Sequence, residues 1–129
     1  METKRTKILL VEDIKVAQTG AILALSELNC EVDVAETGTN ALTLAGQNQY
    51  DLILMDLGLP DVDGMTLTET LRKMPEHQRG TPIIALTAHS DTNYRNDCYE
   101  IGMDGYVVKP LTVDTARDLL TRYVNNKQQ

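Results

Sequence analysis

The chain has 129 residues, of which 42% are hydrophobic and 24% charged, and a formal net charge of -7. This length suits one domain with a real core and is too short for two ordinary domains. The acidic balance argues against a surface for nucleic acid, whose phosphates are met by clustered Lys and Arg. No apolar run approaches the roughly 18 residues that cross a bilayer. We therefore expect a single cytoplasmic domain without direct nucleic-acid or membrane contact over residues 1–129, with a core at about 7–124 and a polar tail at 125–129.

The side chains available for the core are mainly aliphatic, because the chain contains no Phe and no Trp. Val, Ile, Leu and Ala must then fill it. Cys30 and Cys98 are the only cysteines, and they form no C-x-x-C pair. Two partly buried thiols are therefore expected rather than a disulfide or a metal site.

Five short runs of β-branched and aliphatic residues read as strands. The first, third and fourth are apolar without alternation, which is typical of parallel strands covered on both faces. The five runs are Ile8 to Val11, Val32 to Ala35, Leu52 to Met55, Pro82 to Leu86 and Tyr106 to Val108.

The intervals between these strands carry apolar residues at helical spacing. The first three intervals and the segment after the last strand each supply one apolar face, whereas the fourth interval, at Asp91 to Ile101, offers only a thin stripe made by Tyr94, Cys98 and Ile101. The residues expected to bound helices are Asp13, Thr37, Asp63 and Thr112 as N-caps and Gly102 as the end of the fourth helix. Five alternating strand and helix units predict a doubly wound α/β domain with a parallel sheet.

Acidic side chains follow two of the predicted strands. Glu12 and Asp13 come directly after the first strand, and Asp56 comes directly after the third. Right-handed crossovers place the carboxyl ends of all the strands at one edge, where open α/β sheets bind ligands. Three crowded carboxylates repel one another unless a cation joins them. Their oxygen atoms suit Mg²⁺, and no His or Cys is placed for Zn²⁺.

Two further residues end strands at the same edge. Lys109 follows the last strand and precedes Pro110, and Thr87 with the backbone N–H of Ala88 ends the fourth. Each alone could be an ordinary surface or strand residue. Together with the acids they predict phosphoryl transfer to a carboxylate, with Asp56 as the nucleophile that leaves the central strand. A carboxylate is already ionised at neutral pH, so no general base is needed.

These residues resemble the receiver domain of two-component response regulators. Five features match in order: Glu12-Asp13, Asp56 with the turn from Leu59-Pro60 to Asp63-Gly64, Thr87-Ala88, Tyr106, and Lys109-Pro110. The resemblance runs from about Lys7 to about Val124. It implies a flavodoxin-like sheet of strand order 2-1-3-4-5 with five helices. The Thr87-Ala88-His89 run and the Leu57-Gly58-Leu59-Pro60 turn look similar to receivers attached to hybrid histidine kinases.

The resemblance also implies a role for each matching residue. Asp56 would accept a phosphoryl group from a phosphohistidine on a histidine kinase or a histidine phosphotransfer domain. Asp13, Asp56 and the Gly58 carbonyl would hold Mg²⁺ directly, with Glu12 reaching it through water. Lys109, Thr87 and the Ala88 N–H would bind phosphate oxygens. The protein would thus catalyse its own aspartyl phosphorylation and dephosphorylation without being a conventional enzyme.

The resemblance further implies a conformational switch. Thr87 would move toward the phosphate and Tyr106 would turn inward, so that the face formed by the fourth helix, fifth strand and fifth helix changes protein partners. The residues alone favour a plainer interpretation of Tyr106, as a strand aromatic that packs against the fifth helix.

Three other functions compete with this interpretation. A haloacid-dehalogenase-type phosphatase needs a second aspartate two residues after the nucleophile, where this chain has Gly58, and a flavodoxin-type carrier needs a hydroxyl-rich phosphate loop after the first strand. A receiver-like module that binds proteins without phosphorylation is the remaining alternative. The sequence leaves open the kinase, the output partner, the phosphoryl lifetime, a homodimer, and whether the domain stands alone.

Overall fold

The computed structural model describes residues 5–74, 80–88 and 92–125, and the side chains of 92–94 lie outside that description. Asp91, expected to begin the fourth helix, Tyr94, expected to anchor it, and His89 therefore lie outside the described residues or side chains. Of the predicted polar tail at 125–129, only Asn125 is described.

The five predicted strands are all present and pair in parallel in the order β2-β1-β3-β4-β5, so the predicted sheet topology is confirmed. Their registers bring Val11 beside Met55, and Asp56 beside Leu86. The strands are β1 (Thr6–Val11), β2 (Cys30–Ala35), β3 (Leu52–Asp56), β4 (Ile83–Thr87) and β5 (Gly105–Val108).

A helix follows each strand, as the spacing of apolar residues predicts. The last helix continues into one π-helical segment, Leu120–Val124. The helices are α1 (Lys15–Ser26), α2 (Gly38–Gln47), α3 (Gly64–Arg72), α4 (Thr92–Ile101) and α5 (Val113–Leu119). No helix in the described part of the chain has the length and apolar character needed to cross a membrane.

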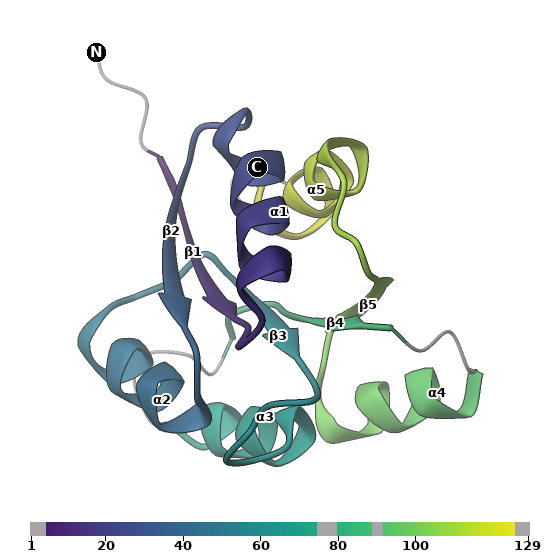
Figure 1. Ribbon diagram of the computed structural model, residues 1–129. Helices are drawn as coiled ribbons and strands as arrows, with labels where there is room; N and C mark the ends of the chain where they lie inside the picture. The colour runs from purple at the N-terminus through teal and green to yellow at the C-terminus, as the bar shows by residue number, and fades with distance from the viewer. Residues whose placement is uncertain (1–4, 75–79, 89–91, 126–129) are drawn as a thin grey trace.

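The helices cover both faces of the sheet, with α1 and α5 on one face and α2, α3 and α4 on the other (Figure 1). Successive strand residues alternate between the two resulting cores, because side chains along a strand point to opposite faces. Ile8 and Leu10 pack with α1 and α5, whereas Leu9 and Val11 pack with α2 and α3. In the described residues both cores are aliphatic apart from a few Tyr, Cys and Met side chains, as the composition requires.

Most predicted helix boundaries are confirmed. Thr37, Asp63 and Thr112 are N-caps whose side chains accept backbone N–H bonds from the first turns of α2, α3 and α5. Gly102 follows the last residue of α4 with φ +116°, a conformation that favours glycine.

The prediction that Asp13 caps the first helix is wrong. The N-cap of α1 is Ile14, which has no side-chain cap bond, and its N–H donates instead to Glu12 Oε2 at 3.2 Å. The Asp13 carboxylate lies with those of Glu12 and Asp56. A side chain that faces the other acids cannot also cap α1.

Candidate functional site

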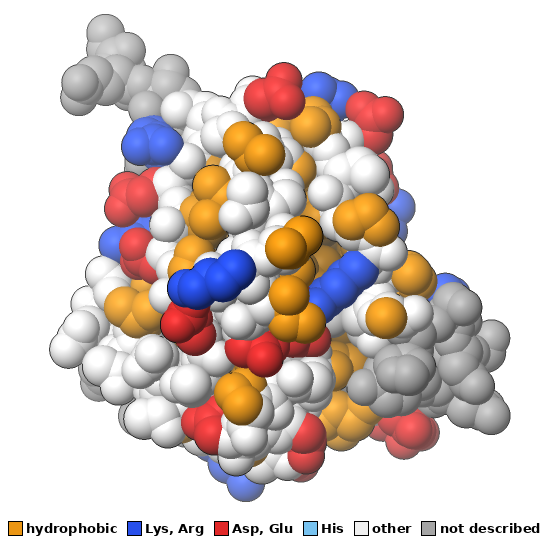
Figure 2. Space-filling model, viewed as in Figure 1, with side chains coloured by type: hydrophobic (Ala, Val, Ile, Leu, Met, Phe, Trp, Pro, Cys, Tyr) orange, Lys and Arg blue, Asp and Glu red, His pale blue; other side chains and the backbone are white. Residues whose placement is uncertain are grey.

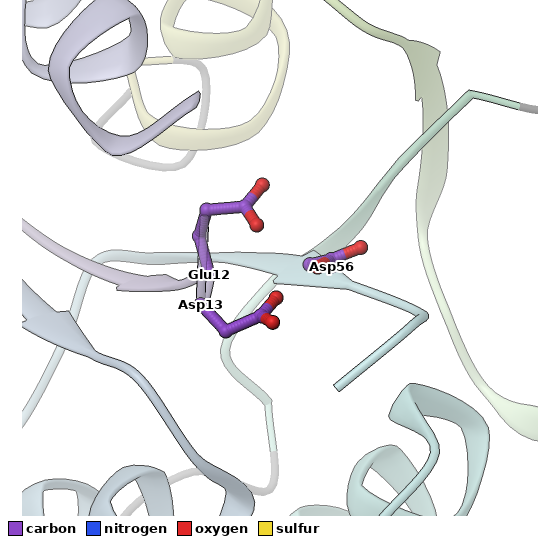
Figure 3. Close-up of side chains that lie close together, drawn as sticks. All are labelled: Glu12, Asp13 and Asp56. Carbon is purple, nitrogen blue, oxygen red and sulfur yellow. The ribbon is translucent and has the colours of Figure 1, made fainter. Parts of the chain in front are cut away.

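Three carboxylates meet at the carboxyl edge of the sheet. Glu12 and Asp13 leave β1, and Asp56 is the last residue of the neighbouring strand β3. One oxygen of each carboxylate lies within 4.8 Å of the others, and Figure 3 shows the three side chains around one space. Glu12 and Asp56 are 1% and 6% exposed. Parallel pairing of β1 with β3 thus brings together the acids that the sequence predicts at one edge.

Lys109 lies after β5 and extends over this edge. Its Nζ is 2.5 Å from Glu12 Oε1 and 3.5 Å from Asp56 Oδ1. Its backbone N–H donates to the Thr87 carbonyl at 2.8 Å, and the Lys109-Pro110 bond is cis. The predicted approach of Lys109 to Asp56 is therefore confirmed, although the shorter contact is with Glu12.

Burial and mutual pairing set the protonation behaviour of Glu12 and Lys109. Burial raises the pKa of the Glu12 carboxyl, and the Lys109 ammonium opposes that shift only in part. Burial by itself would lower the pKa of Lys109, but the bond to Glu12 and the charge of Asp56 outweigh it and raise the pKa. Lys109 therefore stays charged at neutral pH and offsets part of the negative charge.

Asp13 has the chemistry of a cation ligand. Its Oδ1 is buried and has no hydrogen-bond partner in the described part of the structure. A buried carboxylate oxygen without a partner is costly, and a hard cation removes that cost. The oxygen-only set of Glu12, Asp13 and Asp56 fits Mg²⁺ or another hard divalent cation rather than Zn²⁺.

Gly58 lies in the loop that follows Asp56. Its backbone N–H donates to Asp56 Oδ1 at 3.1 Å, so this loop helps to orient the carboxylate. Gly64 closes the loop, since its N–H donates to the Leu57 carbonyl at 3.1 Å. A Cβ at Gly64 would lie 2.8 Å from the Asp56 carbonyl oxygen, so a larger residue would push on the strand end.

Thr87 and Ala88 lie at the end of β4, beside the strand that carries Asp56. Thr87 is buried, whereas Ala88 is exposed and lines a groove together with Lys109. The structure thus brings Thr87, Ala88 and Lys109 to the acidic edge, as predicted from their strand ends.

Tyr106 lies in β5 and packs on the face of the sheet that α4 covers. The guanidinium carbon of Arg95, in α4, lies 5.2 Å from the centre of its ring. Packing against the fifth helix, the plainer interpretation of Tyr106, is therefore wrong. The next residue, Val107, faces the α5 side instead.

Sequence reasoning missed two polar residues that support the site. Gln18, buried in α1, donates from Nε2 to the Glu12 carbonyl at 2.7 Å and to Glu36 Oε2 at 3.1 Å. Asp61 accepts backbone N–H bonds from Gly38 and Thr39. The only sequence signal for Gln18 is a polar residue next to the apolar face of a helix, and Asp61 resembles any loop acid.

An apolar groove borders the acids on the α1 side. Its volume is about 540 Å³, and Glu12 and Lys109 form its polar end. Of its lining residues Ile14 is exposed and Val16 is 82% exposed, and Leu23, further along α1, is exposed too. Figure 2 shows hydrophobic side chains over α1 next to the acidic and basic side chains of the site. The apolar lining comes from Ile14, Val16, Ala17, Ala21, Leu86, Ala88, Pro110 and Leu111.

Curated relatives resemble this chain over part of their length. The chain is 37% identical over 99 residues to the signal transduction histidine-protein kinase BarA of Shigella flexneri, covering 77% of this chain and 11% of that protein. It is 35% identical over 126 residues to the transcription factor prr1 of Schizosaccharomyces pombe, covering 98% of this chain and 23% of that protein. The chain thus spans less than a quarter of either relative.

Solved structures share both fold and sequence with it. The receiver domain of the sensor histidine kinase PA1611 from Pseudomonas aeruginosa PAO1, which has a magnesium ion coordinated in its active site cleft, is 37% identical with a TM-score of 0.85, over 95% of this chain and 99% of that one. The chemotaxis response regulator CheY4 of Vibrio cholerae is 27% identical with a TM-score of 0.85, over 93% of this chain and 99% of that one. The model of the response regulator receiver domain family matches residues 8–121, and the chain belongs to that family of two-component phosphorelay domains.

Proposed function

We propose that residues 1–129 form one receiver domain in which Asp56 accepts a phosphoryl group from a phosphohistidine. The observation that carries this proposal is the position of the Asp56 carboxylate between two other acids and the Lys109 ammonium, with Nζ 3.5 Å from Asp56 Oδ1. A carboxylate beside a fixed cation and a candidate metal site has what phosphoryl transfer requires.

In the proposed reaction a carboxylate oxygen of Asp56 forms a bond to phosphorus as the bond from phosphorus to the donor imidazole nitrogen breaks. The nitrogen keeps the electron pair and, because the other ring nitrogen of the phosphohistidine carries a proton, the group leaves as neutral imidazole. Asp56 becomes an aspartyl phosphate. Lys109 binds a phosphate oxygen, and the Thr87 hydroxyl and Ala88 N–H donate to others. Hydrolysis of the aspartyl phosphate by water returns the carboxylate and inorganic phosphate.

The residues that would hold Mg²⁺ are Asp13, Asp56 and the Gly58 carbonyl, with Glu12 acting through water. Bound there, the ion would neutralise charge on the acids and on the transferring group. The unpartnered Asp13 Oδ1 and the oxygen-only donor set support this assignment.

The proposed output is a rearrangement of the α4-β5-α5 face. Thr87 ends the strand next to β5, and Tyr106 packs with α4 beneath Arg95, so movement of Thr87 toward a phosphate can be passed to α4 through Tyr106. Tyr99 and Val108 are exposed apolar residues on this face and would contact a downstream protein. We infer that the domain acts in a hybrid histidine kinase or a response regulator and needs no direct contact with nucleic acid.

The groove beside α1 suits the docking of the phosphodonor protein. A histidine that reaches Asp56 must come from a protein that packs on the surrounding surface. On the α1 side that surface is apolar and exposed at Ile14 and Val16 in the groove and at Leu23 further along α1. Apolar contact there would orient a histidine kinase or a histidine phosphotransfer domain toward Asp56.

Labelling by acetyl phosphate and Mg²⁺ tests the nucleophile, with phosphate-affinity electrophoresis as the measurement. We expect the native protein to be labelled and Asp56→Asn to remain unlabelled. Equal labelling of both would refute Asp56 as the acceptor. A native protein that neither acetyl phosphate nor a phosphorylated kinase labels would favour the alternative function, a receiver-like module that binds proteins without phosphorylation.

Val16→Asp tests the docking surface, because Val16 is exposed and its side chain lies outside the acidic cluster. Transfer from a phosphorylated histidine phosphotransfer domain should fall by roughly tenfold, as expected when a charge enters an apolar contact, while labelling by acetyl phosphate stays unchanged. Equal loss with both donors would show that the substitution damages the site itself.

Lys109→Ala tests the switch: we expect an unchanged circular dichroism spectrum and no phosphorylation-dependent change of the Tyr106 signals in NMR.

A further inference from the structure

A carboxylate outside the acidic cluster ties the phosphoacceptor loop to a neighbouring helix. Asp61, in the loop between β3 and α3, accepts the Gly38 N–H on Oδ1 at 2.8 Å and the Thr39 N–H on Oδ2 at 3.1 Å. The Thr39 hydroxyl also donates to Oδ2 at 3.2 Å. Gly38 and Thr39 begin α2, whose first N–H groups have no partner within the helix.

The Asp61 carboxylate is a bidentate cap, which the loop between β3 and α3 provides for the N-terminus of α2. The N-cap of α2 itself, Thr37, accepts the Asn40 N–H, so Asp61 binds the N–H groups that Thr37 does not reach. Hydrogen bonding, led by the Gly38 N–H, lowers the pKa of Asp61 and keeps it ionised at neutral pH. A negative charge at a helix N-terminus is favourable.

The close contact between this loop and α2 explains why the helix begins with a glycine. A Cβ on Gly38 would lie 2.1 Å from Cγ1 of Val62, the residue after Asp61. Glycine therefore allows the loop to lie against the start of α2, which Figure 1 shows beside α3.

The other attachments of the loop are on β3 and α3. The Gly58 N–H donates to Asp56, the Gly64 N–H donates to the Leu57 carbonyl, and Asp63 caps α3. Asp61 adds a contact to a third element and lies between these attachments. The span from Gly58 to Asp61 is consequently held from both sides.

We propose that Asp61 is a positioning residue, which holds the loop against α2 so that the Gly58 backbone is preset for Asp56 and for Mg²⁺. This inference rests on the proposed function, because it assigns Asp61 a role in building the same site. Asp61 is not one of the three clustered acids, and it acts through the backbone of its own loop.

Mg²⁺ titrations followed by NMR test this inference, since the amide signals of Gly58, Gly38 and Thr39 report on the metal and the cap separately. Asp61→Ala removes both acceptors, and loss of an outer support typically weakens metal binding by roughly tenfold or more. Asp61→Asn keeps one of the two oxygen acceptors, replaces the other with a donating amide group and loses the charge. Because one acceptor remains and Asn is a good helix cap, Asp61→Asn should bind Mg²⁺ more weakly than native and more tightly than Asp61→Ala. Glu69→Gln removes a charge from an exposed position of α3 and serves as the control.

The outcomes separate positioning from simple charge. Affinities that fall in the order native, Asp61→Asn, Asp61→Ala support the proposal. Equal weakening in Asp61→Asn and Asp61→Ala would mean that the retained hydrogen-bond acceptor makes no difference and would overturn it. Native affinity in Asp61→Ala would also overturn it and leave the proposed function intact. A native protein that binds no Mg²⁺ would refute the proposed metal site and, with it, this inference.

Discussion

Replacing Asp13 by Asn should stabilise the metal-free protein while removing its response to Mg²⁺. The carboxylate oxygens of Glu12, Asp13 and Asp56 lie within 4.8 Å of one another, and Lys109 pairs with Glu12 and Asp56. Two unit charges at that separation repel by about 3.5 kcal/mol at an effective dielectric constant of about 20, and by about 0.9 kcal/mol in bulk water. Asp13 is partly buried. We expect Asp13→Asn to raise the free energy of unfolding by about 1–3 kcal/mol without metal.

The assay is urea denaturation followed by circular dichroism, because the chain has no Trp. Free Mg²⁺ at about ten times its Kd should stabilise the native protein by about 1.4 kcal/mol and should leave Asp13→Asn nearly unchanged. Glu69→Gln, at an exposed position of α3, controls for the general relief of net negative charge. A metal-free Asp13→Asn no more stable than Glu69→Gln, or equal stabilisation of native protein and Asp13→Asn by Mg²⁺, would refute the reasoning.

Three substitutions at other positions test contacts that hold the loops and helices of the fold, each by urea denaturation. Asp63→Ala should lower the free energy of unfolding by about 1 kcal/mol, because the α3 cap is lost. Hydrogen bonding lowers the pKa of Asp63, so this difference is present above pH 3.8 and shrinks as the pH falls through the lowered pKa. A difference that grows in acid would contradict this prediction. Arg72→Lys should lower the free energy of unfolding by about 2 kcal/mol, because one ammonium cannot replace a guanidinium that binds the Gly102 and Thr81 carbonyls and Asp104. Unchanged stability would contradict that role. Gly64→Ala should cost about 1–3 kcal/mol by pressing on the Asp56 carbonyl, and a neutral effect would mean that the loop relaxes.

Local features of the sequence were sufficient to predict the strands and helices and the edge of the sheet that carries the site. Unbroken apolar runs identify β1, β3 and β4, because a strand covered on both faces needs apolar side chains on each. The positions of Glu12, Asp13, Asp56, Thr87 and Lys109 at strand ends then follow from parallel topology. The strand order came from the family resemblance carried by these residues, and the pairing confirms it.

The contacts made by individual polar side chains could not be predicted in this way. Asp13 could have capped α1 or faced Asp56, and the choice depends on how β1 pairs with β3. Tyr106 could have faced either layer of helices, and a shift of one residue along β5 would have reversed its side. Asp61 meets the start of α2 only because α2 and α3 cover the same face of the sheet.

The sequence by itself determined which residues form strands and helices and which chemistry gathers at the sheet edge, because burial periodicity and strand ends are local properties. Only the tertiary structure decided that Lys109 approaches Glu12 more closely than Asp56, that Gln18 holds the Glu12 carbonyl, and that Asp61 ties the loop between β3 and α3 to α2. These contacts join residues far apart in the chain. Their partners are selected by packing, register and the burial of unpaired polar atoms, which no local pattern encodes.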